Sequence, residues 1–377
     1  MVGNERAHGK LCESEKRSMS GSILAEIRTL RNGKSFTGNN ENTNRFRILA
    51  NEANGTCTSY FFSAPIYNIN TGELVKRTFS QEGNLLKARG SNAEIVTDGQ
   101  NVTMYNHEGS VTISMAHTAD ILPTLNGVAV KYTGENGVIL KIKTDKPYKK
   151  SRNNQKYFSI MKDDFTPFLT VSAIGVFDES GEFCCPAKVH YSKIDNDEFS
   201  VFISTDKSIH ENYMFEMNLY EQKLFRDTTV ESKNFDENNI FGGMGFIGRS
   251  DVYGRQWLYI RLDAEKVPEI ISGKMNRAIL HIPKYNNSEV SLTAYNVASR
   301  FCTFASNWRN KVKPENIITE ATVSEKYYSF DITRHIFESG GFKNTNGFVI
   351  KAVSSNKGYA AIATGDNYFT PLILEMY

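Results

Sequence analysis

Residues 241–251 ("FGGMGFIGRSD") carry the glycine spacing of a dinucleotide-binding loop. Gly243, Gly245 and Gly248 fit G-x-G-x-x-G, and Asp263 supplies an acidic residue further along the chain. In that chemistry the pyrophosphate sits on free N–H groups of a helix that follows a buried strand. Here the preceding "ESKNFDENNI" is polar, and the following "RSDVYGRQW" lacks a helical apolar period. The sequence therefore predicts a glycine-rich loop between two antiparallel strands, and no nucleotide site.

Other groupings of reactive side chains lack the partners that catalysis needs. Asp163 and Asp164 are adjacent, whereas the two carboxylates of a glycosidase come from different elements across a cleft. Ser204 and Lys207 fit S-x-x-K, but the partner motifs S-D-N and K-T-G do not occur in the sequence. The seven histidines form neither H-x-H nor H-E-x-x-H. We therefore expect a protein that is not an enzyme.

The number and spacing of the cysteines indicate reduced thiols rather than disulfides. The chain contains five, at Cys12, Cys57, Cys184, Cys185 and Cys302. Their number is odd, two of them are adjacent, and none shows the C-x-x-C spacing of a zinc site. A disulfide framework is therefore not expected.

The charge and hydropathy of the chain exclude several classes of partner. The net charge is +2 over 377 residues, whereas nucleic-acid binding calls for a strongly basic domain or stripe. No run approaches the roughly 18 apolar residues that a membrane helix needs. The first residues lack the apolar region of a secretory signal. We therefore expect no nucleic acid, no membrane insertion, and cytoplasmic synthesis with release by a non-classical route or within a particle.

From about residue 35 the chain alternates short apolar runs with turn residues. An Asp-Gly, Asn-Gly or similar pair of turn residues between two alternating apolar–polar runs is a hairpin signal. Strands that recur about every ten residues predict a β-sandwich or barrel. Residues 20–31 have helical apolar spacing, and the final "TPLILEMY" ends in alternation that predicts a strand within a sheet. The turn pairs are Asp98-Gly99, Glu108-Gly109, Asn126-Gly127 and Asn136-Gly137.

Residues 226–377 carry an ordered series of motifs. A glycine-rich stretch leads to "WLYIRLD", then to "RAILHIP", "VSLTAYNV", "SNWRN", "SFDIT", "TNGFVIKA" and "PLILE". This series resembles the DNRLRE domain, a jelly-roll β-sandwich similar to carbohydrate-binding modules, although the hexapeptide that names the domain is absent. Upstream, "FFSAPIYN", "PTLNGVAV" and "NLYEQKLFRDTTVES" resemble the β-rich segment that precedes this domain in bacterial proteins. The resemblance implies an architecture and no catalytic activity.

These patterns together predict an all-β protein of tandem β-sandwiches that ends in a C-terminal jelly roll. Residues 1–34 form a short polar arm, either flexible or helical. Residues 35–130 and 131–225 form two β modules, or one sandwich between them. Residues 226–377 form the DNRLRE-like jelly roll.

Two tryptophans mark a candidate binding site in the last segment. Trp257 follows Arg255 in "GRQWLYIR", and Trp308 precedes Arg309 and Asn310 in "SNWRNK". A sugar site uses flat aromatic rings together with a few polar groups that fix orientation. The alternative for Trp257 is a place in the core, because tryptophan is on average highly buried. Trp308 stands in a polar loop, where binding residues concentrate.

A second polar stretch, "ATGDNYFTP", places Asp366 and Tyr368 on an expected loop tip. It predicts either a ligand contact or an Asx-turn that closes a hairpin. The resemblance to similar sandwiches implies one structural calcium ion, with Asp227, Glu231 and Asp366 as candidate ligands. Asp331, in "SFDIT", is expected to accept hydrogen bonds from a neighbouring loop.

The function expected from these residues is non-catalytic binding of a polysaccharide or cell-surface glycan by the C-terminal sandwich. The alternative is a structural appendage, such as a component of a phage tail or surface assembly. That alternative predicts a homo-oligomer, because such assemblies repeat one interface.

Overall fold

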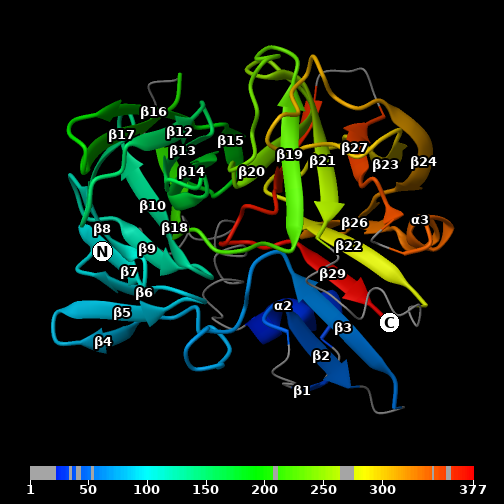
Figure 1. Cartoon of the computed structure of the whole chain (residues 1–377), viewed down its shortest axis with the longest axis horizontal. Helices are drawn as coiled ribbons and strands as arrows, with labels where there is room; N and C mark the ends of the chain where they lie inside the picture. Colours follow the sequence, from blue (N-terminus) through cyan, green and yellow to red (C-terminus); the bar gives the residue numbers. More distant parts are fainter. Residues whose placement is uncertain are drawn as a thin grey trace. The chain divides into compact units, whose positions relative to one another are not determined.

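The computed structural model is built almost entirely of antiparallel strands (Figure 1). It describes residues 23–33, 36–39, 44–51, 55–206, 211–263, 276–341, 344–353 and 358–377. The chain divides into two compact units. The first unit comprises residues 1–33, 65–221 and 368–370, and the second comprises residues 34–64, 222–367 and 371–377. Each unit encloses its own apolar core between two sheets, so the predicted tandem β-sandwiches are confirmed.

The first unit packs an eight-stranded sheet against a seven-stranded sheet. The eight-stranded sheet has the order β16 (Lys188–Lys193), β17 (Glu198–Ser204), β11 (Val138–Thr144), β8 (Gly109–Met115), β7 (Asn101–Asn106), β6 (Glu94–Thr97), β5 (Leu85–Arg89) and β4 (Ser80–Glu82). The other has the order β12 (Lys150–Asn153), β13 (Tyr157–Met161), β14 (Pro167–Phe177), β18 (Glu211–Leu219), β10 (Gly127–Gly134) and β9 (Asp120–Pro123), with β15 (Phe183–Cys185) paired to β14. Helix α2 (Ile23–Leu30) also belongs to this unit, and residues 1–22 of the predicted arm lie outside the described residues.

The second unit packs two seven-stranded sheets together. One has the order β1 (Thr37–Asn39), β2 (Arg47–Asn51), β3 (Cys57–Phe62), β29 (Ile373–Met376), β22 (Ala278–Pro283), β26 (Tyr327–Asp331) and β25 (Thr322–Val323). The other has the order β24 (Pro314–Glu320), β23 (Leu292–Val297), β27 (Phe348–Ala352), β21 (Gly254–Leu262), β20 (Met244–Ser250) and β28 (Gly358–Ala363), with β19 (Phe225–Glu231) paired to β21. Helix α3 (Thr333–Glu338) follows β26.

The units fit the alternative in which residues 35–130 and 131–225 share one sandwich, but their bounds differ from those of the predicted segments. Residues on both sides of position 130 share one core, because Ile95 and Met104 cluster with Phe215 and Met217. Residues 34–64 belong to the second unit, where β3 pairs with β29. A fragment that begins at residue 226 would therefore lack β1, β2 and β3.

Alternation of apolar and polar residues explains most strands. In β11 the side chains of Val138, Leu140 and Ile142 are buried, whereas those of Lys141 and Lys143 are exposed. A strand with this pattern covers a core with one face and meets water with the other. The run "TPLILEMY" also behaves as predicted, because β29 lies in the sheet between β3 and β22.

One of the four predicted hairpins is wrong. Asp98-Gly99, Glu108-Gly109 and Asn126-Gly127 each join two paired strands. Asn136-Gly137 instead joins β10 to β11, which lie in different sheets. Both residues have positive φ, 63° and 94°, so the chain turns as the dipeptide demands. The turn residues determine only that the chain reverses its direction locally. Which sheet the next strand joins depends on where its apolar face can be buried.

The prediction for the glycine pattern also needs correction. Gly245 and Gly248 lie within β20, a strand paired with both β21 and β28, and not in a loop. A Cβ atom at Gly248 would come within 2.4 Å of the carbonyl oxygen of Gly358 on β28. The glycines therefore allow close packing, and the strand rules out the helix N-terminus that a dinucleotide needs.

Residues 368–370 are held inside the first unit by buried polar groups. The carboxylate of Glu216 on β18 accepts hydrogen bonds from the backbone N–H of Tyr368 (3.2 Å) and Phe369 (3.1 Å). Arg77 donates to the carbonyl of Phe369 and pairs with Glu26 of helix α2 at 2.9 Å. Buried polar groups are costly unless they are satisfied, so this network fixes the path of the segment.

In the part of the chain that the structure describes, neither helix has the length and apolar character needed to cross a membrane. No disulfide joins the four described cysteines, Cys57, Cys184, Cys185 and Cys302, to one another.

We expect Glu216→Gln to lower the free energy of unfolding by about 1.5–3 kcal/mol, because hydrogen bonds to a charged group contribute about this much. Urea unfolding followed by circular dichroism measures the change. The matched control is Glu198→Gln on β17, whose carboxylate forms an exposed pair with Lys143 at 3.4 Å. The control should change stability by less than about 0.5 kcal/mol. Equal effects of the two variants would contradict the prediction.

Candidate functional site

An aromatic and cationic cluster lies on one face of the second unit. Trp257 on β21, Lys351 on β27 and Tyr295 on β23 come from three strands that are neighbours in one sheet (Figure 1). The next residue along β21, Leu258, faces the core, so alternation turns Trp257 to the opposite face. Trp308 reaches the same face from the loop between β23 and β24. We call Trp257, Tyr295, Trp308, Lys311 and Lys351 the aromatic–lysine cluster.

Cation–π contacts join the members of this cluster. The rings of Trp257 and Trp308 are 5.0 Å apart between centroids and tilted by 55°. The Lys311 ammonium lies 3.9 Å from the centroid of Trp308 and 5.2 Å from that of Trp257. The Lys351 ammonium lies 4.9 Å from the centroid of Trp257 and 4.3 Å from that of Tyr295. Such contacts hold long, flexible lysine side chains over the rings.

A small apolar core fixes the rings from below. Trp257, Tyr295 and Trp308 pack against a buried group that includes Tyr259 and Phe301. The loop that carries Trp308 is tied to the sheet, because the hydroxyl of Tyr259 donates to the carbonyl of Val312 at 2.6 Å. Side chains within the loop complete its hydrogen bonds, including Asn310 Nδ2 to the carbonyl of Ala305 at 2.8 Å. The rings are therefore set in place before any ligand arrives.

Positive charge dominates the surface next to the cluster. A cavity of about 210 Å³ adjoins Trp257 and is lined by cations from three strands, with no carboxylate in its lining. Burial lowers the pKa of both Lys311 and Lys351. Within the described ranges, none of the four cations of this surface lies within 4.0 Å of a carboxylate. These cations are Arg249, Arg255, Lys311 and Lys351.

The other sequence-predicted residues of the binding site have different roles. Arg309 is exposed, pairs with Asp236 at 2.8 Å and stacks over the ring of Phe235 at 4.2 Å. Asn310 holds its own loop. The structure therefore unites Trp257, Trp308 and Arg255 on one surface and uses Arg309 and Asn310 to shape the loop.

The expectation that Asp366 and Tyr368 lie on an exposed loop tip is wrong. Both are buried, and Tyr368 is 3% exposed. Asp366 forms an ion pair with Lys223, and the hydroxyl of Tyr368 donates to the carbonyl of Glu221 at 3.2 Å. Their partners lie more than a hundred positions earlier in the sequence, so no local pattern indicates that these polar residues are buried. Neither residue is available to a glycan.

The three carboxylates suggested for calcium do not form a metal site. Among the described residues, no group of three or more His, Cys, Asp or Glu side chains is placed to hold a metal ion. Glu231 accepts hydrogen bonds from Asn234 at 2.9 Å and from Gln256 at 2.7 Å. Asp227 accepts from the N–H of Gly365 at 3.1 Å, and Asp366 is paired with Lys223. Each of these carboxylates thus has at least one partner within the protein.

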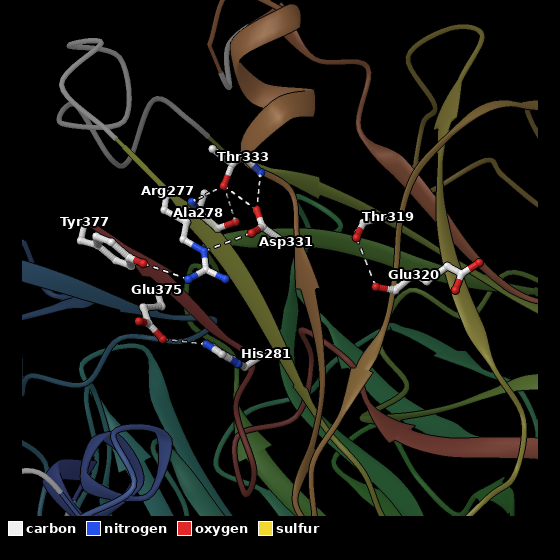
Figure 2. Close-up of polar contacts among 9 residues, drawn as sticks. All are labelled: Arg277, Ala278, His281, Thr319, Glu320, Asp331, Thr333, Glu375 and Tyr377. Carbon is white, nitrogen blue, oxygen red and sulfur yellow. Dashed lines mark hydrogen bonds and ion pairs between the residues drawn. The ribbon is translucent and has the colours of Figure 1, made fainter.

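Asp331 has the structural role expected of it. Figure 2 shows its carboxylate between Thr333, which donates through its N–H (3.2 Å) and its hydroxyl (2.5 Å), and Arg277, whose Nε lies at 3.0 Å. These bonds lower the pKa of Asp331 against the opposing effect of burial. The carboxylate thereby joins the start of β22 to the start of helix α3.

A hydrogen-bonded row on the same sheet has the composition of a catalytic triad. His281 forms a hydrogen bond with Ser329 through Nδ1 at 2.9 Å. Its Nε2 forms a second hydrogen bond with Glu375 at 2.9 Å (Figure 2). No local sequence pattern marks this row, because its members come from three separate strands. Acyl transfer also needs free N–H groups for the oxyanion. Ser329 lies inside β26, which pairs on both sides, so its backbone serves the sheet. The row is a cross-strand hydrogen-bond chain.

Sequence reasoning also missed Tyr295, Lys311, Lys351 and Arg249. Alternation in "SLTAYNV" and "GFVIKA" places Tyr295 and Lys351 on the outward faces of their strands. That signal was available, but it does not reveal which strands are neighbours. The cluster depends on the order β23, β27 and β21, which only the fold provides.

Comparisons with known proteins assign no family to this chain. No protein-family model matches it, and no curated protein matches it. Among solved structures, a mutant of the heparan sulfate lyase HepC from Pedobacter heparinus matches 66% of this chain and 46% of its own, with 11% identity and a TM-score of 0.19. A heparinase III with methylated lysines matches 67% of this chain and 45% of its own, with 9% identity and a TM-score of 0.18. The chain spans less than half the length of these proteins, and neither activity is transferred to it.

The buried carboxyl of Asp227 predicts a specific dependence of stability on pH. Burial raises its pKa to about 6, against an opposing effect of Lys223. A carboxyl with a raised pKa binds its proton more tightly in the folded state, so its contribution is present at pH 4 and lost as pH rises to 6. At about 1.4 kcal/mol per pKa unit, the loss is about 2–3 kcal/mol.

We expect the stability advantage of the native protein over Asp227→Asn to decrease by this amount between pH 4 and pH 7. Urea unfolding at each pH measures the difference. Asp98→Asn is the control with a nearly flat profile in this window, because hydrogen bonds from Asn101 lower the pKa of Asp98 and its contribution is lost only below about pH 4. Parallel pH profiles for the two variants would refute the role of Asp227.

Proposed function

We propose that the second unit binds an acidic polysaccharide or surface glycan, without catalysis, at the aromatic–lysine cluster. The observation that carries the proposal is the set of two tilted tryptophan rings with two lysine ammonium groups lying on them. Aromatic faces suit the C–H faces of sugar rings, and unpaired cations suit carboxylate or sulfate groups.

Charge decides between neutral and acidic ligands. Lys311 and Lys351 occupy positions over the rings that a neutral sugar would need for stacking. An acidic sugar draws each ammonium toward its anionic group and thereby uncovers the ring. The partly buried ammonium groups also gain a counter-charge that the described part of the chain does not provide.

Single-stranded nucleic acid offers the same two kinds of group, because bases stack on aromatic rings and phosphates bind cations. The cations of this surface form a small patch, and the chain as a whole carries a net charge of only +2. We therefore favour the glycan, and oligonucleotides serve as a competitor in the test.

We expect the full-length chain to bind polygalacturonate or dextran sulfate, and Trp308→Ala to bind at least about tenfold more weakly, as for loss of one aromatic anchor. Isothermal titration calorimetry measures both affinities. The matched control is Phe165→Ala in the first unit, an exposed aromatic with Lys150 over its ring at 3.8 Å. The proposal fails if no acidic glycan binds, if Trp308→Ala binds like the native chain, or if poly(dT) binds more tightly than either glycan.

The lysines should provide the preference for acidic ligands. We expect Lys351→Gln to weaken binding of the acidic glycan about tenfold at low ionic strength, and less at high ionic strength, because salt screens the lost attraction. Lys150→Gln, which removes a lysine from an aromatic ring elsewhere, should leave the affinity unchanged. A loss that is independent of ionic strength would assign Lys351 a role in packing only.

A further inference from the structure

The first unit contains a cleft that the proposed function does not use. Its volume is about 390 Å³, within the range of about 300–1,000 Å³ typical of small-molecule sites. It is lined by residues from strands β4 to β7 and from the segment 68–79. Glu94 on β6 and Tyr105 on β7 both line the cleft, and alternation places their side chains on the face of the sheet opposite to Ile95 and Met104, which belong to the core.

A cross-strand row presents a fixed aromatic ring to this cleft. Arg89, Glu94 and Tyr105 lie opposite one another on β5, β6 and β7. The hydroxyl of Tyr105 donates to Glu94 at 2.6 Å, and Arg89 Nε lies 3.9 Å from the other oxygen of that carboxylate. The hydrogen bond to Glu94 raises the pKa of Tyr105, so the donor keeps its proton. The Tyr105 side chain is nevertheless 39% exposed, which leaves the ring accessible.

The wall of the cleft is also fixed. Asn68 Nδ2 donates to the carbonyl of Gly90 at 2.8 Å and so ties the wall to the end of β5. Its Oδ1 accepts from the N–H groups of Asn70 (2.9 Å) and Thr71 (3.0 Å). A ligand that enters a preformed cleft loses less free energy to ordering than one that must shape its own site.

The charges that line the cleft balance. The three cations are Lys76, Lys87 and Arg89, and the three carboxylates are Glu73, Glu82 and Glu94. Lys87 pairs with Glu82, and Arg89 pairs with Glu94. An ionic ligand would have to break these pairs. A ligand with many hydroxyl groups could use them, since carboxylates accept and guanidinium and ammonium groups donate hydrogen bonds.

We propose that this cleft is a second binding site, which takes a neutral saccharide stacked on the ring of Tyr105 and hydrogen-bonded by Glu94, Arg89 and Lys87. The site is independent of the aromatic–lysine cluster and differs from it in charge. The competing occupant is an extended peptide paired with the edge strand β4. That strand is only three residues long, so it offers few backbone hydrogen bonds.

The test uses the full-length chain on a printed array of neutral oligosaccharides that covers common hexoses, pentoses, deoxyhexoses and N-acetylhexosamines. We expect at least one neutral glycan to bind, and Tyr105→Ala to weaken it at least about tenfold, as for an aromatic anchor. Tyr105→Phe keeps the ring and should stay within about threefold of the native affinity. Val96→Arg places a long side chain on the lining of the cleft and should also abolish binding.

Controls separate this site from the one in the second unit. Trp308→Ala should leave neutral binding intact, and Tyr105→Ala should leave acidic binding intact. Phe165→Ala should change neither. The proposal is overturned if no neutral glycan binds, if binding survives Tyr105→Ala and Val96→Arg, or if a random peptide library competes for the cleft. None of these outcomes affects the acidic site, whose failure is detected by Trp308→Ala alone.

Discussion

The path of the last residues of the chain depends on the hydrogen bonds that the buried carboxylate of Glu216 accepts. This carboxylate accepts the N–H groups of Tyr368 and Phe369 and holds three residues in the first unit, between β28 and β29 of the second. The next strand, β29, lies in the interior of its sheet, between β3 and β22. Residues 368–377 therefore take part in both sandwiches. A buried charge that loses its partners is strongly destabilising, so Glu216 fixes the path of residues 368–370 within the first unit.

The aromatic–lysine cluster shows how packing controls the placement of charge. The apolar group around Tyr259 and Phe301 fixes the rings of Trp257 and Trp308, and the rings then hold two ammonium groups. Each step uses a weaker interaction than the one before it, from apolar burial to cation–π contact. A change in the core beneath the rings would therefore displace the charges, although no charged residue had been altered.

The sequence was most informative where a local pattern of residue types specifies one kind of local structure, such as a strand or a turn. The alternation in β11 and the Asp98-Gly99 turn predicted the strands and the hairpin correctly, and the polar residues before Gly243 correctly indicated that the glycines do not begin a helix. It failed where the outcome depends on distant partners. Asp366 and Tyr368 are polar residues that can be buried because Asp366 forms an ion pair with Lys223 and the hydroxyl of Tyr368 donates a hydrogen bond to Glu221. Lys351 joins the cluster only because β27 lies between β23 and β21, an order that local patterns do not encode.

The discontinuity of the first unit also sets a timing for its assembly. Glu216 and Glu221 leave the ribosome well before Tyr368, and at about 5–20 residues per second the delay is roughly 7–30 s. During this interval the first unit lacks the backbone donors that satisfy the Glu216 carboxylate, and β3 and β22 of the second unit lack the strand between them. Completion of both cores thus waits for the same ten residues. A nascent chain that stalls before residues 368–377 are synthesised would have two incomplete sandwiches. Their unpaired strand edges would then be accessible to chaperones or to neighbouring chains.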